Sequence, residues 1–155
     1  MNRILKLAVA LGLILLVSFP VAAAPKSLEV TIEVDTLFEG DVPYPSPFIA
    51  FGPAVDAGLV CESGTVYDIG AVFAGPPDFA RQNFHMYKQF VCDDGSGYFI
   101  INLKSHVVFD PYNDIGPWNM MKGSDAYEML HGQGTLEGTP TYTGVFDVYT
   151  GWVDN

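Results

Sequence analysis

Hydrophobic and polar residues alternate along several segments of the chain. In residues 28–35 (LEVTIEVD), every second residue is apolar and the residues between them are polar. In residues 98–109 (YFIINLKSHVVF), the odd-numbered positions are apolar apart from Ser105, while the even-numbered ones include Asn102 and Lys104. A period of two predicts strands with one face against a core and the other in water.

Further strands are expected at five other places, which are residues 65–73, 84–92, 118–122, 132–137 and 142–153. The turn-forming sequence of residues 93–97 (DDGSG) separates the strand ending at 92 from the one beginning at 98, which predicts a hairpin. Helix evidence is confined to residues 125–130 (DAYEML), where Ser124 could cap one short turn and Gly132 could end it.

These elements predict an all-β fold with at most one short helical turn. Many short strands separated by glycines form either a sandwich or a closed barrel. The 16 Gly and 11 Pro residues fit frequent turns and bent strands, and Gly132, Gly134 and Gly138 would let strands bend or approach closely. A closed barrel also removes the exposed sheet edges that promote aggregation, so we expect an antiparallel barrel.

One stretch, residues 40–58 (GDVPYPSPFIAFGPAVDAG), departs from this pattern because it is rich in proline and aromatic residues. It is too long for a tight turn, so we expect a long loop containing Tyr44, Phe48 and Phe51. Such a loop can be a lid or a binding loop. In the alternative interpretation, its aromatic side chains plug one end of the sheet.

The first 24 residues have the layout of a secretory signal peptide. Arg3 and Lys6 precede an apolar run over residues 7–19, and small residues follow up to Ala24. The run is shorter than the roughly 20 residues that a membrane-spanning helix needs. We therefore expect cleavage after Ala23 or Ala24, a single β-barrel domain over residues 25–155, secretion or another extracytoplasmic location, and no membrane span after signal removal.

Charge and composition exclude several classes of function. Asp and Glu outnumber Lys and Arg by 18 to 7, which gives a formal net charge of −11 and a sequence pI of about 4.3. Nucleic acid is excluded as a partner because phosphate binding needs a basic surface. An aromatic content of 14% excludes intrinsic disorder, since disordered chains lack such apolar area.

The chain has two cysteines, Cys61 and Cys92, and both follow the signal segment. An even count in an exported chain favours a disulfide between them. On the chain-entropy model, such a bridge stabilises the fold by roughly 3 to 4 kcal/mol. The alternative is a reactive thiol at one of the two positions.

Two acidic segments could supply oxygen ligands. Asp93 and Asp94 are adjacent carboxylates beside glycines, and residues 110–114 (DPYND) form a second oxygen-rich segment. Calcium sites need several oxygens at alternating spacing, whereas these residues are also ordinary turn formers. We therefore expect turns at both places and predict no metal site.

No catalytic residue can be assigned from motifs. His85, His106 and His131 lie on different segments without the spacing of a zinc site, although one could serve as a general base in a cavity. Ser105 has no recognisable base in the sequence. The chain contains no nucleophile elbow, P-loop or dinucleotide fingerprint, so no cofactor is predicted.

Three segments, taken together, resemble a known type of protein. They are residues 61–66 (CESGTV), residues 90–99 (FVCDDGSGYF), and Trp118 followed by residues 123–127 (GSDAY) and 130–138 (LHGQGTLEG). Their order and spacing resemble small secreted proteins, mostly uncharacterised, that share the barrel of allene oxide cyclases and dirigent proteins.

The resemblance covers roughly residues 60–151. It implies a calycin-like antiparallel β-barrel of about eight strands with a cavity, and a pairing of Cys61 with Cys92. It does not imply the enzymes' chemistry, because the acidic positions that those proteins use cannot be matched to this chain residue by residue.

Aromatic residues are abundant, since all but one of the 11 Phe, 8 Tyr and 2 Trp follow the signal segment. An eight-stranded barrel is either filled by side chains or holds one small ligand. Tyr67, Tyr87 and Tyr98 could add hydroxyl groups to an apolar pocket wall. The alternative is that the rings fill the core and its ends.

The sequence therefore predicts a non-catalytic barrel that binds a small apolar or aromatic ligand, or an extracellular structural role. A second hypothesis is a cyclase or isomerase acting in the barrel cavity, which requires a buried carboxylate or tyrosine with a perturbed pKa beside an apolar pocket. A third is an acidic extracellular interaction module whose binding to a cationic partner is salt-sensitive.

Overall fold

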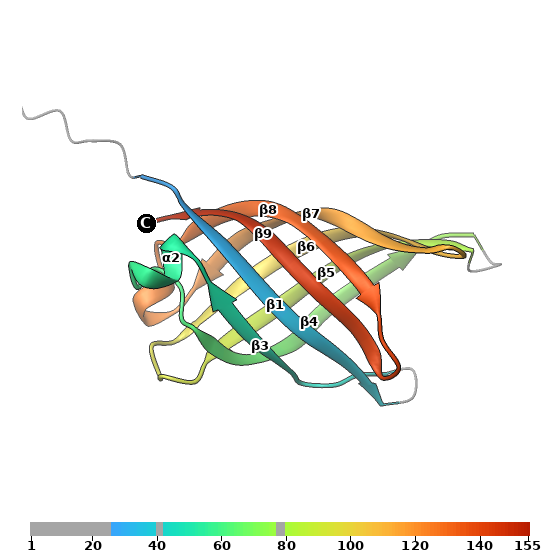
Figure 1. Cartoon of the computed structure of the whole chain (residues 1–155), viewed down its shortest axis with the longest axis horizontal. Helices are drawn as coiled ribbons and strands as arrows, with labels where there is room; N and C mark the ends of the chain where they lie inside the picture. Colours follow the sequence, from blue (N-terminus) through green and yellow to red (C-terminus); the bar gives the residue numbers. More distant parts are fainter. Residues whose placement is uncertain (1–25, 40–41, 77–79) are drawn as a thin grey trace, which may run out of the picture.

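The chain folds into a closed antiparallel β-barrel. The computed structural model describes residues 26–39, 42–76 and 80–155, and within them eight strands form the barrel (Figure 1). They are β1 (Leu28–Glu39), β3 (Ser46–Phe51), β4 (Ser63–Ala74), β5 (Arg81–Cys92), β6 (Tyr98–Phe109), β7 (Tyr112–Gly123), β8 (His131–Pro140) and β9 (Gly144–Asp154). Each pairs with the next, and β9 pairs back along β1, so the all-β prediction is confirmed as a barrel rather than a sandwich.

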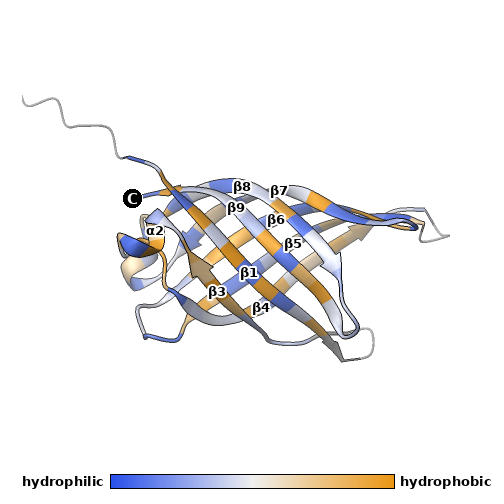
Figure 2. Ribbon diagram, viewed as in Figure 1, coloured by the Kyte–Doolittle hydropathy of each residue, from blue (hydrophilic) through white to orange (hydrophobic). Residues whose placement is uncertain are grey.

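The alternation of the sequence becomes the inside and outside of this barrel. On β1, Val30, Ile32 and Val34 are at most 2% exposed, whereas the residues between them are not buried. Figure 2 shows the same alternation of hydrophobic and hydrophilic residues along the strands. The predicted hairpin of residues 84–109 is also present, because β5 and β6 pair antiparallel on either side of a turn.

The expectation of a long loop over residues 40–58 is wrong. This stretch holds the short strand β2 (Val42–Pro43), the barrel strand β3 and the helix α2 (Pro53–Asp56). On β3, Phe48 and Ala50 are buried, but the outward Ile49 and Phe51 are apolar too and are 54% and 46% exposed. Since both faces of β3 carry apolar residues, its sequence does not alternate visibly.

The prediction of a turn over residues 110–114 is wrong for residues 112–114, which belong to a strand. β7 begins at Tyr112, six residues before the predicted strand start at Trp118. Its inward positions in this part are Tyr112, Asp114 and Gly116, which are polar or small. An inward row of this kind carries no hydrophobic signal, although it lies on a regular strand paired with β6 and β8.

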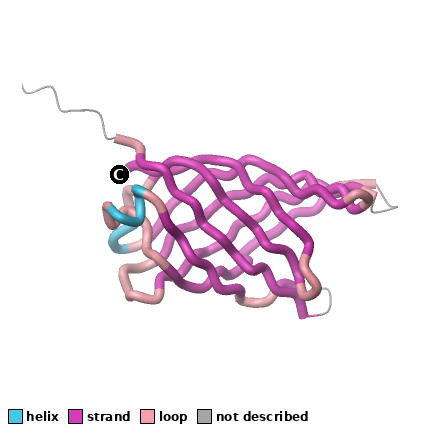
Figure 3. The backbone as a smooth tube through the Cα atoms, viewed as in Figure 1, coloured by secondary structure: helices cyan, strands magenta, loops and turns pink. Residues whose placement is uncertain are grey.

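Both helical segments lie at one end of the barrel (Figure 3). The predicted helical turn at residues 125–130 is present as η1 (Asp125–Tyr127), but Ser124 makes no side-chain capping bond there. The sequence does not predict α2, which starts at Pro53, where proline is favourable. Residues 1–24, the predicted signal peptide, lie outside the described residues. Among the described residues, no helix combines the length and apolar character needed to cross a membrane.

The half of the barrel next to these helical segments is packed with buried hydrophobic side chains. Its centre is a set of rings that we call the aromatic cluster, made of Phe48, Phe90, Phe99, Trp118 and Tyr149. The rings of Phe90 and Phe99 stack with centroids 5.0 Å apart, and the Tyr149 ring meets Phe90 edge-on at 5.9 Å. Some of the aromatic residues therefore fill this half of the barrel, whereas others, such as Phe73 and Phe109, are exposed.

The two cysteines form a disulfide. The Sγ atoms of Cys61 and Cys92 are 2.06 Å apart and their Cα atoms 6.0 Å apart, and no cysteine in the described part of the chain is free. The bridge ties the segment before β4 to the end of β5. The predicted pairing is confirmed, and it is consistent with an oxidising environment.

The glycines of β8 allow close approach, as predicted. A methyl group on Gly134 would lie 1.9 Å from the carbonyl oxygen of Thr150, and one on Gly151 would lie 2.7 Å from the Trp118 indole. Strands β8 and β9 therefore pack around the Trp118 ring only because these positions carry no side chain.

Candidate functional site

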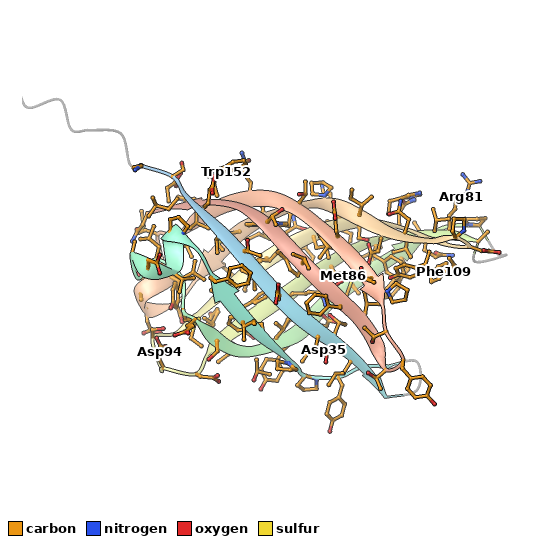
Figure 4. The ribbon with its side chains drawn as sticks, viewed as in Figure 1. Asp35, Arg81, Met86, Asp94, Phe109 and Trp152 are labelled. Carbon is orange, nitrogen blue, oxygen red and sulfur yellow. A yellow bond between two sulfur atoms is a disulfide. The ribbon has the colours of Figure 1, made fainter. Side chains whose placement is uncertain are left out.

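A cavity of about 700 Å³ occupies the other half of the barrel. It lies at the end where β6 turns into β7 and β8 into β9, around Phe109 and Gly144. In Figure 4, Phe109 lies toward this end, whereas Asp94, in the turn after β5, lies at the opposite end. A volume of this size accommodates a small organic molecule.

The cavity walls are mainly apolar and come from β4, β5, β6, β8 and β9. The strand period places Phe84 and Met86 on the inward face of β5, and Leu103 and Val107 on that of β6. Phe73 and Phe109 also line the cavity; they are 59% and 47% exposed. The walls can therefore bury the apolar body of a ligand.

A polar layer separates this cavity from the aromatic cluster, and we call it the polar floor. It consists of Asp68, Lys88, Asp114 and Asp147. Lys88 stands on the inward face of β5 between Met86 and Phe90 and is 3% exposed. Its Nζ atom lies 2.9 Å from Oδ1 of Asp68, whose side chain is 17% exposed. This ion pair compensates for removing the ammonium group from water.

Asp147 on β9 is the most buried carboxyl group of the polar floor, at 5% exposed. The hydroxyl of Thr36 on β1 donates a hydrogen bond of 2.6 Å to its Oδ2 atom. Burial raises the pKa of Asp147 to about 6, and the charges of Asp114 and Asp68 act in the same direction, against the influence of Lys88 and Thr36. Asp147 therefore exchanges its proton close to neutral pH.

Asp114 on β7 stands on the other side of β8 from Asp147. Its Oδ1 atom accepts a hydrogen bond from the hydroxyl of Ser105 on β6, and burial raises its pKa. Both aspartates are in register with Gly138, where an added methyl group would lie 2.9 Å from Oδ2 of Asp114 and 3.0 Å from Oδ1 of Asp147. The two oxygens therefore lie within about 6 Å of each other, a separation at which ionisation of one disfavours that of the other.

Two tyrosines complete the site. Tyr112 lines the cavity, and burial together with the charge of Asp114 raises its pKa. Tyr149 is fully buried, and its hydroxyl has no hydrogen-bond partner among the described residues. Burial, then the charges of Asp147, Asp68 and Asp114, raise the pKa of Tyr149.

The histidines do not contribute to this site. The ring of His85 is hydrogen-bonded to Asn102 at 2.7 Å and that of His106 to Asn83 at 2.9 Å, while His131 is exposed on β8. None of these three described side chains lines the cavity. The titratable groups that line the cavity are instead carboxyls, Lys88 and Tyr112.

The acidic turn after β5 is an ordinary turn at the closed end of the barrel, which is the end that carries the helical segments and lies opposite the cavity. Asp94 accepts hydrogen bonds from the backbone and side chain of Ser96, which lower its pKa, and Asp93 accepts one from Ser63. Across the residues that the structure describes, no three His, Cys, Asp or Glu side chains are grouped to hold a metal ion.

The tyrosines that the sequence suggested for a pocket wall lie elsewhere. Tyr67 is 42% exposed, and the lining of the cavity includes neither it nor Tyr87 nor Tyr98. Ser105, in contrast, does line the cavity, and its bond to Asp114 supplies a carboxylate partner that the sequence did not reveal.

The polar floor was not predicted from the sequence. The available signal was a charged residue within an inward row that is otherwise apolar. Lys88 interrupts the row that contains Met86 and Phe90, and Asp147 interrupts the row that contains Val145 and Tyr149. A charge at such a position is rarely placed in a barrel interior without a partner or a function.

A smaller hollow of about 440 Å³ lies on the outside of the barrel, over β7, β8 and β9. Gln133, Thr135 and the half-exposed Trp152 line it, and Figure 4 shows Trp152 on this outer surface. Its lining contains no carboxyl group. The barrel cavity is therefore the stronger candidate site.

Comparison with known proteins gives no functional assignment. No family model matches the chain, and no curated protein or solved structure shows significant similarity to it.

Proposed function

We propose that the protein binds a small, mainly apolar or aromatic molecule inside the barrel. The observation that carries this proposal is the cavity of about 700 Å³, whose walls are apolar and whose polar groups are gathered at its floor. This combination is typical of ligand sites, in which apolar walls supply affinity and a few polar groups fix orientation. An extracellular structural role would not require an unfilled interior.

Binding of the neutral, environment-sensitive dye Nile red tests this proposal. Val107 lines the cavity on β6, whereas its neighbour Val108 is directed to the outer face of the same strand. Val107→Trp should fill part of the cavity and weaken dye binding at least tenfold, and the matched control Val108→Trp should change it less than twofold. Absence of dye binding, or equal effects of both variants, would contradict the proposal.

A second candidate function is an isomerase or cyclase that uses acid–base chemistry in the same cavity. It is favoured by Asp147, whose raised pKa of about 6 and proximity to Asp114 give one carboxyl that gains and loses a proton near neutral pH. A desolvated carboxylate beside an apolar pocket is an effective general base.

This chemistry can be tested without knowing the substrate. When a base removes the C3 proton of 5-nitrobenzisoxazole, the C=N bond becomes a nitrile, the N–O bond breaks, and the opened ring is a coloured cyanonitrophenolate. Ring opening should be faster than with free carboxylate in buffer, rise with pH through about 6, and be lost in Asp147→Asn. A rate equal to that in buffer would contradict a reactive carboxylate.

We further propose that the protein is exported and cleaved after Ala23 or Ala24, and that it is related to the barrels of allene oxide cyclases and dirigent proteins. The disulfide between Cys61 and Cys92 supports export, and the eight-stranded antiparallel barrel agrees with the relationship. Mass spectrometry of the protein from its native host should show a chain that begins at Ala24 or Pro25. A chain that retains Met1 and its signal segment would contradict export by this route.

A further inference from the structure

The polar floor carries more negative than positive groups. It holds three carboxyl groups and one ammonium group, and Lys88 makes its ion pair with Asp68. Asp114 and Asp147 each accept a hydrogen bond from a hydroxyl group, but within the described part of the chain neither has a cation within 4.0 Å. The charge of Lys88 still lowers the pKa of both, although less than burial raises it.

One oxygen of each of these two carboxyl groups lies beside Gly138. They are Oδ2 of Asp114 and Oδ1 of Asp147. Ser105 bonds Oδ1 of Asp114 and Thr36 bonds Oδ2 of Asp147, and the Tyr112 side chain also bonds the Asp114 carboxyl. Both aspartates line the cavity, and Gly138 places no side chain between the two oxygens. A group that donates two hydrogen bonds and carries a positive charge fits between them.

An independent feature also indicates a missing partner. The hydroxyl of Tyr149, which stands two residues after Asp147 on β9, is fully buried and has no hydrogen-bond partner among the described residues. Buried hydroxyl groups are almost always hydrogen-bonded, so this one needs a partner that the described residues do not supply.

We propose that the cavity binds an apolar or aromatic amine, whose ammonium group bonds Asp114 and Asp147 across Gly138 while its apolar body lies against the cavity walls. This inference rests on the proposed function, and it adds the chemical class of the ligand. A neutral ligand leaves the two carboxyl groups without a cation, and a carboxylate ligand has to displace Asp68 from Lys88. The net charge of −11 also attracts cations to the protein.

The proposal also predicts the direction of the pH dependence. Facing Asp147 are Asp114 and Tyr112 on β7, Lys88 on β5 and Asp68 on β4, with Tyr149 next to it on β9. Of the charged groups among them, only Lys88 is a cation, and Asp147 itself ionises at about pH 6. An aliphatic amine stays charged throughout, so its affinity should rise at least fivefold between pH 5 and pH 7.5, whereas that of an alcohol should not.

The test compares three probes of nearly equal size by calorimetric titration at pH 7.5, namely 4-phenylbutylamine, 4-phenylbutan-1-ol and 5-phenylpentanoate. The wild-type protein should bind the amine at least tenfold more tightly than the alcohol. Asp147→Asn and Asp114→Asn should each weaken amine binding at least tenfold and change alcohol binding less than threefold. The exposed Asp35 on β1 provides the control, because Asp35→Asn removes the same charge from the outer surface and should change neither affinity (Figure 4).

The other outcomes are distinguishable. Equal affinity for amine and alcohol, or an effect of Asp35→Asn as large as that of Asp147→Asn, would overturn the amine assignment and leave the apolar site intact. Tightest binding of 5-phenylpentanoate would overturn it in favour of an acidic ligand at Lys88. If no probe bound and Nile red did not bind either, the proposed function itself would fail.

Discussion

Asp147 makes the stability of the fold depend on pH. Its pKa is about 6 in the folded protein, compared with the ordinary aspartate value of 3.8, so the folded form holds the proton more tightly than the unfolded chain does. The contribution of Asp147 to the free energy of unfolding is therefore greatest below pH 4 and declines as pH rises through 6. The carboxylate is an unfavourable buried charge at neutral pH, which is common at functional sites.

Asp147→Asn removes this dependence, because the amide cannot ionise and still accepts the bond from Thr36. The free energy of unfolding of the variant, relative to the wild type, should rise by about 2 kcal/mol between pH 4 and pH 7. Urea unfolding at the two pH values measures it, with Asp35→Asn as the control. A difference that does not change with pH would show that Asp147 is not buried as described.

The ion pair of Lys88 gives a second prediction at this scale. Lys88→Met leaves the Asp68 carboxylate without its partner and should lower the free energy of unfolding by about 3 kcal/mol. Adding Asp68→Asn should recover part of that loss, since the double variant no longer holds the Asp68 carboxylate without its partner. Urea unfolding of Lys88→Met, Asp68→Asn and the double variant measures the coupling, and simply additive losses would contradict the pairing.

Individual residues also show what the sequence could reveal. Lys88 and Asp147 were detectable, because each is a charge in an apolar inward row. Asp68 was not detectable in this way. The register between β4 and β5 shifts between Asp68 and Gly70, which breaks the period of two at that point. The convergence of Asp114 and Asp147 on Gly138 depends on the pairing of three strands, which no local pattern contains.

At the scale of elements, strands with one apolar face were predictable and strands with mixed faces were not. β1 and β6 match their predicted segments because inward and outward residues differ in polarity. β3 was missed because it is apolar on both faces, and the first half of β7 was missed because its inward face is polar. The misjudged part of β7 is also the part that supplies Tyr112 and Asp114 to the site.

The disulfide is the element-scale feature with the clearest energetic consequence. It joins residues 31 positions apart, at the closed end of the barrel. Replacing both cysteines, as Cys61→Ala with Cys92→Ala, should lower the free energy of unfolding by about 3 to 4 kcal/mol, because the unfolded chain gains freedom. Denaturant unfolding measures the loss. A reducing agent should destabilise the wild type equally and leave the double variant unchanged, and an unaffected wild type would contradict the prediction.

For the whole molecule, the barrel divides into a packed half and a cavity half. The aromatic cluster, α2 and η1 occupy one end, and the polar floor separates them from the cavity at the other (Figure 1). Composition predicted enough apolar residues for a barrel, but it could not show that the interior is filled only in part. That outcome depends on how the inward rows of eight strands meet after closure.

The central claim is that ligands enter the cavity half and leave the packed half undisturbed. Methyl resonances observed by NMR during titration with Nile red test it most directly, since methyl groups occur in both halves. Shifts should gather at Leu103, Val107, Leu136 and Val145, which line the cavity, and be absent at Val60 and Leu130 in the packed half. Shifts confined to the packed half or to the outer surface would contradict the account.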